Sequence, residues 1–320
     1  MSVYTQVSKS QLETLLQDYD LGLVVSIEPV AAGIENTNYK IKLDNDGVIS
    51  HYFFTIFENI ATQELHFFLP LFSHLKTHGC HLPAPIKQRN GENIFIFENK
   101  PGAIFECLTG HHIENIQAHH CQRVGEELAH IHVAAQNFPQ QHKNPRGFQW
   151  VAQTVSGNLL QLPKTDWQFA KQALKNIESF HQHWQALDLP FGFIHGDLFN
   201  DNCLFSDDGQ INGVIDFYAG GDDFWIYDIA ITLMAWTADV EGFDPEKQQA
   251  LIKGYESVRT LTPDEQMLLP QFMCLAALRF YLTRVQSAQL QQQAGLQPSK
   301  DPKYMQNILT QFLDQALDRS

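Results

Sequence analysis

Apolar side chains near the start of the chain recur at intervals of three and four residues, which is the spacing of one face of a helix. They are Leu12, Leu15, Leu16 and Tyr19. Ser8 and Gln11 precede them with the spacing of a capping box, and Gly22 follows as a residue that commonly ends a helix. We therefore predict that a helix opens the chain.

The hydrophobic period changes to two after this helix, as it does in strands. Between Tyr39 and Leu43 apolar residues alternate with lysines, and a turn signal at Asn45-Asp-Gly47 separates this stretch from the apolar run 51–57. Paired strands joined by such a turn form a hairpin. Residues 24–57 are therefore expected to form an antiparallel meander.

Three further elements are expected to complete a small α+β lobe, because their apolar residues follow helix or strand spacing between turn signals. They are a helix over 63–78, a hairpin over 86–98 that turns at Asn90-Gly91, and a strand over 103–108. We place the end of this first lobe at residue 108.

Residues 109–320 are expected to form a larger, mainly helical lobe. Helical spacing occurs over 124–135 and 166–188, Thr262-Pro-Asp-Glu265 combines a capping box with proline at the first helical position, and Asp301-Pro302 repeats the proline signal. The predicted class is therefore α+β, with a small antiparallel sheet in the first lobe and helices in the second. A glutamine-rich stretch, 286–297, is expected to be solvent-exposed helix or loop.

Charge and cysteine content narrow the classes of function. The chain of 320 residues carries a formal charge of -15 with no basic stripe, which argues against nucleic-acid or membrane partners. Its five cysteines are an odd number without C-x-x-C spacing, which favours a reducing cytoplasm over a disulfide framework or structural zinc site. No segment resembles a signal peptide or approaches membrane-spanning length.

One segment carries the chemistry of phosphoryl transfer, which needs an oriented hydroxyl and metal-bridged phosphates. In His195-Gly-Asp197-x-x-x-x-Asn202, Asp197 is placed to accept the proton of a substrate hydroxyl, and Asn202 to offer an amide oxygen to Mg²⁺. Asp216 follows a predicted hairpin and offers an anionic ligand to the metal. His195 and Asp228 are interpreted as residues that hold this loop. We therefore predict an ATP- and Mg²⁺-dependent kinase of a small hydroxylated metabolite.

The same residues resemble the aminoglycoside phosphotransferase and choline kinase group, which has a bilobal, protein kinase-like fold. Within the group, the most similar branch is the bacterial homoserine kinases, and the stretches that carry this resemblance are Asp216–Ile231, Ala235-Trp236, Asn144–Gly147, Ala277–Phe280, Tyr19–Gly22 and Ala32–Tyr39. The resemblance implies transfer of the ATP γ-phosphate to the hydroxyl of L-homoserine, a step toward threonine.

The resemblance also implies where ATP binds. Three residues would form the loop over the phosphates, and three more the hinge beside adenine; these are Gly33, Asn36 and Asn38, then Glu106, Cys107 and Leu108. One departure is Thr55, which stands where kinases normally carry a phosphate-binding lysine. Glu64, the candidate for the usual partner of that lysine, would then be without it, and metal and loop would offset the phosphate charge instead.

A zwitterionic substrate needs a cation for its carboxylate and an acid for its ammonium group. Arg279 or Arg284 could take the carboxylate, and Asp201, Asp222 or Asp223 the ammonium. Trp225 and Tyr227 could wall the pocket, and such a wall would also suit choline or ethanolamine. A nucleotide-binding regulator without turnover is the competing class. The sequence does not settle whether the protein is a monomer or a homodimer.

Overall fold

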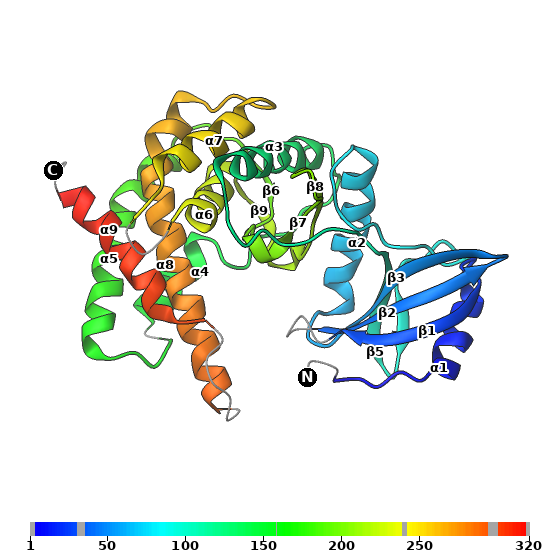
Figure 1. The fold of residues 1–320 in the computed structure, drawn as a ribbon. Helices are drawn as coiled ribbons and strands as arrows, with labels where there is room; N and C mark the ends of the chain where they lie inside the picture. Colours follow the sequence, from blue (N-terminus) through cyan, green and yellow to red (C-terminus); the bar gives the residue numbers. More distant parts are fainter. Residues whose placement is uncertain (1–3, 31–35, 158, 239–241, 294–299, 318–320) are drawn as a thin grey trace. The chain divides into compact units, whose positions relative to one another are not determined.

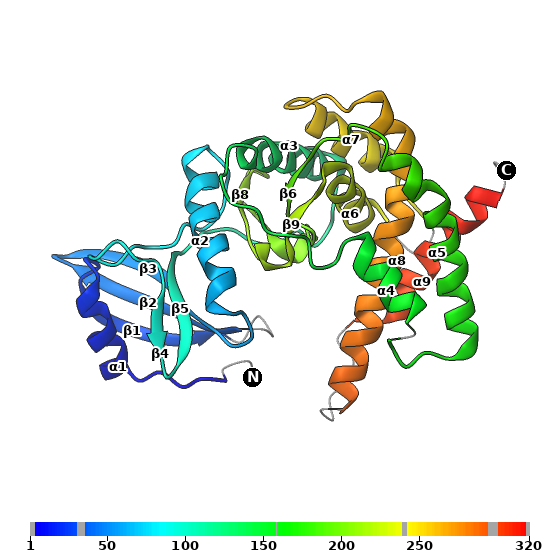
Figure 2. The same cartoon turned by 180° about the vertical axis from the view of Figure 1, so that it is seen from behind.

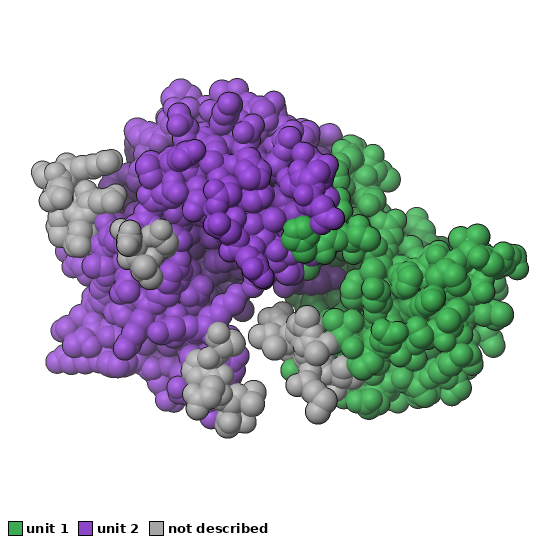
Figure 3. Space-filling view, in the orientation of Figure 1, with its two compact units in different colours: residues 1–111, 212–215 green, residues 112–211, 216–320 purple. Residues whose placement is uncertain are grey.

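The computed structural model describes residues 4–30, 36–157, 159–238, 242–293 and 300–317. The chain divides into two compact units (Figure 3). The first comprises residues 1–111 with 212–215, and the second comprises residues 112–211 with 216–320. Each unit has its own packed interior, and each is described by itself below.

The first unit is built on a five-stranded antiparallel sheet with the order β1-β2-β3-β5-β4 (Figures 1 and 2). Its elements are α1 (Lys9–Leu15), a short 3-10 turn (Leu16–Asp18), β1 (Leu23–Val30), β2 (Asn36–Asn45), β3 (Val48–Phe57), α2 (Thr62–Thr77), β4 (Phe95–Phe97) and β5 (Lys100–Glu106). The predicted opening helix, meander and second helix are confirmed. The last predicted strand begins at residue 100 and ends at residue 106 rather than spanning 103–108.

The predicted capping box starts α1 as expected. The Ser8 hydroxyl accepts the Gln11 N–H, and the Gln11 side chain accepts the Ser8 N–H in return. Leu12 and Leu16 then pack with Ile41 of β2 in one buried cluster that covers a face of the sheet. The apolar alternation of β2 therefore faces this helix.

The hairpin predicted over 86–98 is wrong. The Asn90-Gly91 turn exists, with Gly91 at φ 91° and the Gln88 N–H bonded to the Glu92 carbonyl at 2.8 Å, but residues 86–89, which the structure describes, form no strand before the turn, and the N–H of Ile86 bonds to Ile104 of β5. The hairpin lies further along the sequence, where Glu98 and Asn99 join β4 to β5. Both residues are in the left-handed region, at φ 49° and 66°. Left-handed residues other than glycine are uncommon, so the sequence carries little sign of this turn.

The second unit is mainly helical, as predicted. Its helices are α3 (Ala118–Ala135), α4 (Phe148–Ser156), α5 (Lys164–Trp184), α6 (Trp225–Thr237), α7 (Pro245–Glu256), α8 (Pro263–Gln293) and α9 (Pro302–Leu317) (Figure 1). The capping box before α8 is confirmed, because Glu265 N–H donates to the Thr262 hydroxyl at 3.1 Å and the Glu265 carboxylate accepts the Thr262 N–H at 2.9 Å. The glutamine-rich stretch is helical to residue 293, and its remainder lies outside the described residues.

Two short strand pairs lie between α5 and α6 in the sequence. β6 (Phe191–Ile194) pairs antiparallel with β9 (Gly221–Phe224), so that Ile194 faces Gly221. β7 (Cys203–Phe205) and β8 (Ile211–Val214) are the arms of the predicted hairpin. Over the described residues, none of the helices is both long and apolar enough to cross a membrane.

Candidate active site

The catalytic loop, residues 195–202, begins where β6 ends and is held by one buried carboxylate. The backbone N–H of His195 donates to Asp228 Oδ2 at 2.6 Å, and that of Gly196 donates to Asp228 Oδ1 at 2.8 Å. Asp228 lies in the first turn of α6 and is fully buried. Burial would raise its pKa, but the hydrogen bonds from the His132 side chain and the Gly196 N–H lower the pKa below its usual range. The interior therefore retains a carboxylate that fixes the start of the loop.

Asp197 is the accessible acid of this loop, with a side chain 33% exposed. Its backbone N–H donates to His195 Nδ1 at 3.2 Å, and its carbonyl accepts the Phe199 N–H at 2.8 Å. Burial raises the pKa of Asp197, and the guanidinium of Arg279, 3.9 Å from Oδ1, opposes that rise. An acid of raised pKa that still reaches solvent has the properties of a general base.

Asn202 and Asp216 are the predicted metal ligands. Asn202 Nδ2 donates to the Asp197 carbonyl at 2.7 Å, which leaves the amide oxygen as the group that could bind a cation. Asp216 is exposed and has a left-handed backbone, φ 64° and ψ 57°, a conformation that is uncommon for residues other than glycine. No cluster of three His, Cys, Asp or Glu side chains suits a metal in the part of the chain that the structure describes. A divalent cation here would therefore need an amide oxygen and phosphate oxygens as well.

The two arginines predicted to bind substrate lie on α8 but differ in their surroundings. Arg279 is 4% exposed, and its Nη1 has no hydrogen-bond partner among the described residues. Arg284 lies over the ring of Tyr304 and donates to the Asp301 carbonyl at 3.4 Å. Arg279 is therefore the arginine that approaches Asp197 with a donor still to satisfy.

A lysine that the sequence analysis did not single out also belongs to this region. Lys300 Nζ lies 3.1 Å from Asp201 Oδ2, and both side chains are more than half exposed. The lysine ammonium also lies 5.7 Å from the ring centroid of Phe199. Lys300 follows the glutamine-rich stretch, where no motif marks it, and only the fold brings it to the catalytic loop.

The predicted acids on β9 lie against a different segment. The His142 N–H donates to Asp222 Oδ2 at 2.9 Å, and Asn144 Nδ2 donates to Asp223 Oδ2 at 2.7 Å. Burial raises the pKa of Asp223 to about 6. Both acids line a cavity of about 490 Å³, together with aromatic residues such as Trp184.

The aromatic residues proposed as a pocket wall are buried. Trp225 is 2% exposed and stacks on His132 with ring centroids 5.2 Å apart. Tyr227 is 1% exposed, and its hydroxyl donates to the Arg146 carbonyl at 3.3 Å. Their role in substrate binding stays a prediction, since the contacts described for both are with the interior.

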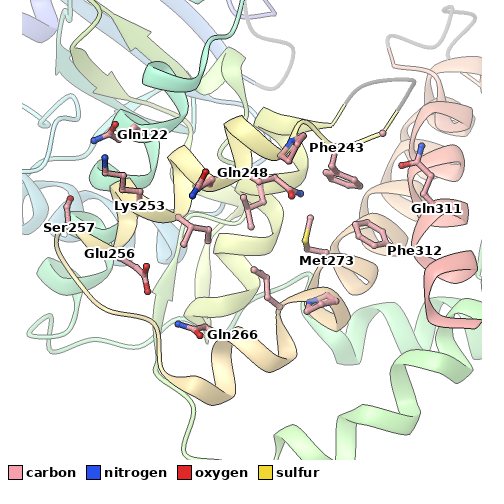
Figure 4. A pocket seen from close by; sticks show the side chains of 17 residues that line it. Gln122, Phe243, Gln248, Lys253, Glu256, Ser257, Gln266, Met273, Gln311 and Phe312 are labelled. Atoms are coloured by element: carbon pink, nitrogen blue, oxygen red, sulfur yellow. The ribbon is translucent and has the colours of Figure 1, made fainter. Parts of the chain in front are cut away.

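A larger groove of about 1300 Å³ lies elsewhere in the second unit (Figure 4). It is lined by side chains from α7, α8 and the described part of α9, including Gln248, Met273 and Phe312. None of the residues predicted to take part in catalysis or binding lines this groove. Its size alone therefore does not mark the reaction centre.

The residues predicted for the phosphate loop lie at the start of β2, apart from Gly33, which is outside the described residues. Asn38 Oδ1 accepts the hydroxyl of Thr55 at 2.8 Å, and Asn36 Oδ1 is buried without a hydrogen-bond partner among the described residues. Glu64 accepts the Ala61 N–H at 3.0 Å, so its carboxylate is used at the start of α2. Thr55 thus bonds to the neighbouring strand β2, at the position where kinases normally carry a lysine.

The predicted hinge follows directly from β5. Glu106 forms an ion pair with Lys76 at 3.2 Å, and its backbone N–H donates to the Ala84 carbonyl at 3.1 Å. Cys107 is partly exposed, and its Sγ lies 3.9 Å from the Leu108 carbonyl oxygen. Their contact with adenine stays a prediction.

The loop, its buried acid and the sheet-plus-helix architecture together define a phosphotransferase. Residues 26–261 match the model of the phosphotransferase enzyme family, and the chain belongs to that family. The fold is confirmed by a solved structure of amicoumacin kinase in complex with AMP-PNP and Ca²⁺, with a TM-score of 0.71 at 16% identity over 98% of this chain and 94% of that one. The predicted fold class is therefore right.

Within this family the chain is one of the homoserine kinases. It is 34% identical to the homoserine kinase of Cupriavidus metallidurans over 99% of this chain and 98% of that protein. It is 35% identical to the homoserine kinase of Methylobacillus flagellatus over 97% of this chain and 94% of that protein. The predicted branch is confirmed, and the chain is an ATP-using kinase with an alcohol group as acceptor.

Proposed function

We propose that the protein transfers the γ-phosphate of ATP to the side-chain hydroxyl of L-homoserine, with Asp197 as the base. The hydroxyl oxygen forms a bond to the γ-phosphorus while the bond to the ADP oxygen breaks, and the hydroxyl proton passes to the Asp197 carboxylate. Transfer is direct, without a phosphoenzyme. The observation that carries this proposal is the pairing of an accessible carboxylate, Asp197, with the buried guanidinium of Arg279 at 3.9 Å.

Arg279 is proposed to bind the α-carboxylate of the substrate. A buried guanidinium with an unsatisfied N–H favours an anionic partner, because an unmade hydrogen bond of a charged group is costly. The short side chain of homoserine would allow its carboxylate to reach Arg279 while its hydroxyl reaches Asp197. Choline and ethanolamine have no carboxylate for this position.

Asp201 is the acid that we assign to the substrate ammonium group. Its charge is close enough to influence the pKa of Asp197, as is that of Lys300. Asp222, by contrast, already accepts a backbone hydrogen bond from His142. The ammonium group would replace or join Lys300 beside the Asp201 carboxylate.

Asn202 and Asp216 are proposed to hold Mg²⁺, which when bound would neutralise charge on the phosphates. The fit rests on the amide oxygen of Asn202 and on the left-handed backbone of Asp216. The nucleotide would be held by Asn36 and Asn38 with Gly33, and by Glu106, Cys107 and Leu108. This assigns residues 1–108 to the nucleotide and residues 109–320 to catalysis and substrate.

The test is ADP release by the full chain in the presence of ATP, Mg²⁺ and one acceptor at a time. The informative comparison is homoserine against 3-aminopropan-1-ol, which keeps the amine and hydroxyl but lacks the carboxylate; ethanolamine and choline complete the set. We expect homoserine to give the highest kcat/KM. Equal turnover of the two first acceptors would refute the carboxylate anchor, and nucleotide binding without turnover of any acceptor would favour a regulator instead.

A further inference from the structure

A chain of buried polar side chains runs from the catalytic loop to the start of α8. His132 of α3 lies between two partners, with Nε2 3.1 Å from Asp228 Oδ2 and Nδ1 2.8 Å from the Tyr255 hydroxyl. Arg259 follows, with its Nε 3.0 Å from the same hydroxyl. His132, Asp228 and Tyr255 are fully buried.

The direction of every hydrogen bond in this chain can be assigned. Burial lowers the pKa of His132, which favours the neutral ring with one N–H. Asp228 is an acceptor, so the N–H is on Nε2 and Nδ1 must accept the Tyr255 hydroxyl proton. The oxygen of Tyr255 is then free to accept from Arg259 Nε–H, and no donor meets a donor anywhere along the chain.

Arg259 is itself held in place by a residue outside this row of hydrogen bonds. Its Nη1 and Nη2 both bond to the carboxylate of Glu265, which is fully buried and also caps α8 through Thr262. The guanidinium lies 5.0 Å from the ring centroid of Trp225, the ring on which His132 stacks. A planar, permanently charged donor is thus fixed at the far end of the chain.

We propose that Tyr255 and Arg259 are positioning residues for phosphoryl transfer, because they hold the His132 ring with its Nε2–H directed at Asp228. Without the Tyr255 hydroxyl, Nδ1 of His132 is buried without a donor and the ring is no longer held from that side. The hydrogen bond from Nε2–H to the Asp228 carboxylate is weakened as a result. The loop that carries Asp197 loses its fixed acceptor as a consequence.

The test compares Tyr255→Phe with Tyr281→Phe in the full chain. Tyr281 is an equally buried tyrosine whose hydroxyl donates to Asp166 at 3.3 Å and takes no part in the hydrogen bonds from Asp228 to Arg259. We expect roughly a tenfold fall in kcat for Tyr255→Phe, the upper range for one lost hydrogen bond, with less than a twofold change in KM for ATP. Tyr281→Phe should keep the wild-type kcat at a temperature where both variants are folded, and Arg259→Lys, which lacks the Nε donor, should lose kcat in the same way.

A spectroscopic measurement shows whether Tyr255 positions His132 or only stabilises the folded protein. Nitrogen-15 NMR of labelled histidine should show His132 as the Nε2–H tautomer in the wild type, and a shift of the Nδ1 resonance in Tyr255→Phe because Nδ1 loses its donor. An Nδ1–H tautomer in the wild type would overturn the inference even if the variant fails to fold, as would equal losses of kcat in the two tyrosine variants. The activity readout rests on the proposed function, but the tautomer does not, so failure of one is distinguishable from failure of the other.

Discussion

Replacing Arg279 by methionine tests the proposed acceptor site most directly. Methionine keeps much of the apolar volume but removes the guanidinium that lies 3.9 Å from Asp197. A hydrogen bond to a charged group contributes about 1.5–3 kcal/mol, which corresponds to a fall of roughly 10- to 150-fold in kcat/KM for homoserine. Because Arg279 is only 4% exposed and its Nη1 has no hydrogen-bond partner among the described residues, we expect a value toward the upper end.

The same variant should also change the pH dependence of kcat/KM. Two unit charges at this separation attract by ~4 kcal/mol at an effective dielectric constant of about 20, and the partial exposure of Asp197 reduces this attraction. Removing the cation favours the protonated acid, so the pKa of Asp197 rises further. Activity that needs the carboxylate should then be lost at a higher pH than in the wild type as the pH falls.

The assay is steady-state ADP release with homoserine and with 3-aminopropan-1-ol across this pH range. Arg279→Met should remove the preference for homoserine, whereas Arg284→Met, on the same helix, should keep it. Equal losses with both acceptors would show that Arg279 does not bind the carboxylate. A selective loss in Arg284→Met alone would move the anchor to that residue.

Three further changes have defined outcomes. Asp197→Asn should lower kcat by about 10²–10⁴-fold, the usual contribution of a general base, while equilibrium titration finds ATP affinity nearly unchanged; a nearly active variant would remove Asp197 from that role. Asp216→Asn should raise the Mg²⁺ concentration needed for half-maximal rate, and an unchanged Mg²⁺ titration would count against it as a ligand. Gly254→Ala would place a Cβ against the Gln122 carbonyl oxygen of α3, so thermal or urea unfolding should show a fall of about 1–3 kcal/mol in the free energy of unfolding, whereas Gln249→Ala, at an exposed position of α7, should have little effect.

Local sequence signals predicted those parts of the fold whose physics is local. The caps at Ser8 and Thr262 are satisfied within three residues, and the turn between β2 and β3 uses Asp46 and Gly47 in left-handed conformations. The catalytic loop is similar, because Asn202 bonds to Asp197 five residues away. Such contacts follow from spacing alone.

Contacts that only tertiary packing creates could not be predicted from the sequence. Lys300 and Asp201 are 99 positions apart, and the hydroxyl of Tyr255 meets His132 over 123 positions. Trp225 was expected in a pocket wall because aromatic residues suit either environment, and nothing local distinguishes an interior indole from an exposed one. The hairpin at Glu98 was missed for a related reason, since the sheet tolerates two left-handed residues there that sequence statistics disfavour.

The pairing of β6 with β9 has a consequence for how this family can change its acceptor. The catalytic loop continues from β6, the helix that carries Asp228 continues from β9, and the Asp228 carboxylate bonds back to the loop. Strand pair, loop and helix form a closed ring of covalent chain and hydrogen bonds. Arg279 on α8 and Lys300 before α9 belong to segments outside that ring. On the proposed roles, acceptor choice depends on residues outside this ring as well as on Asp201 within it, so we expect substitutions on α8 to change acceptor preference without breaking the ring.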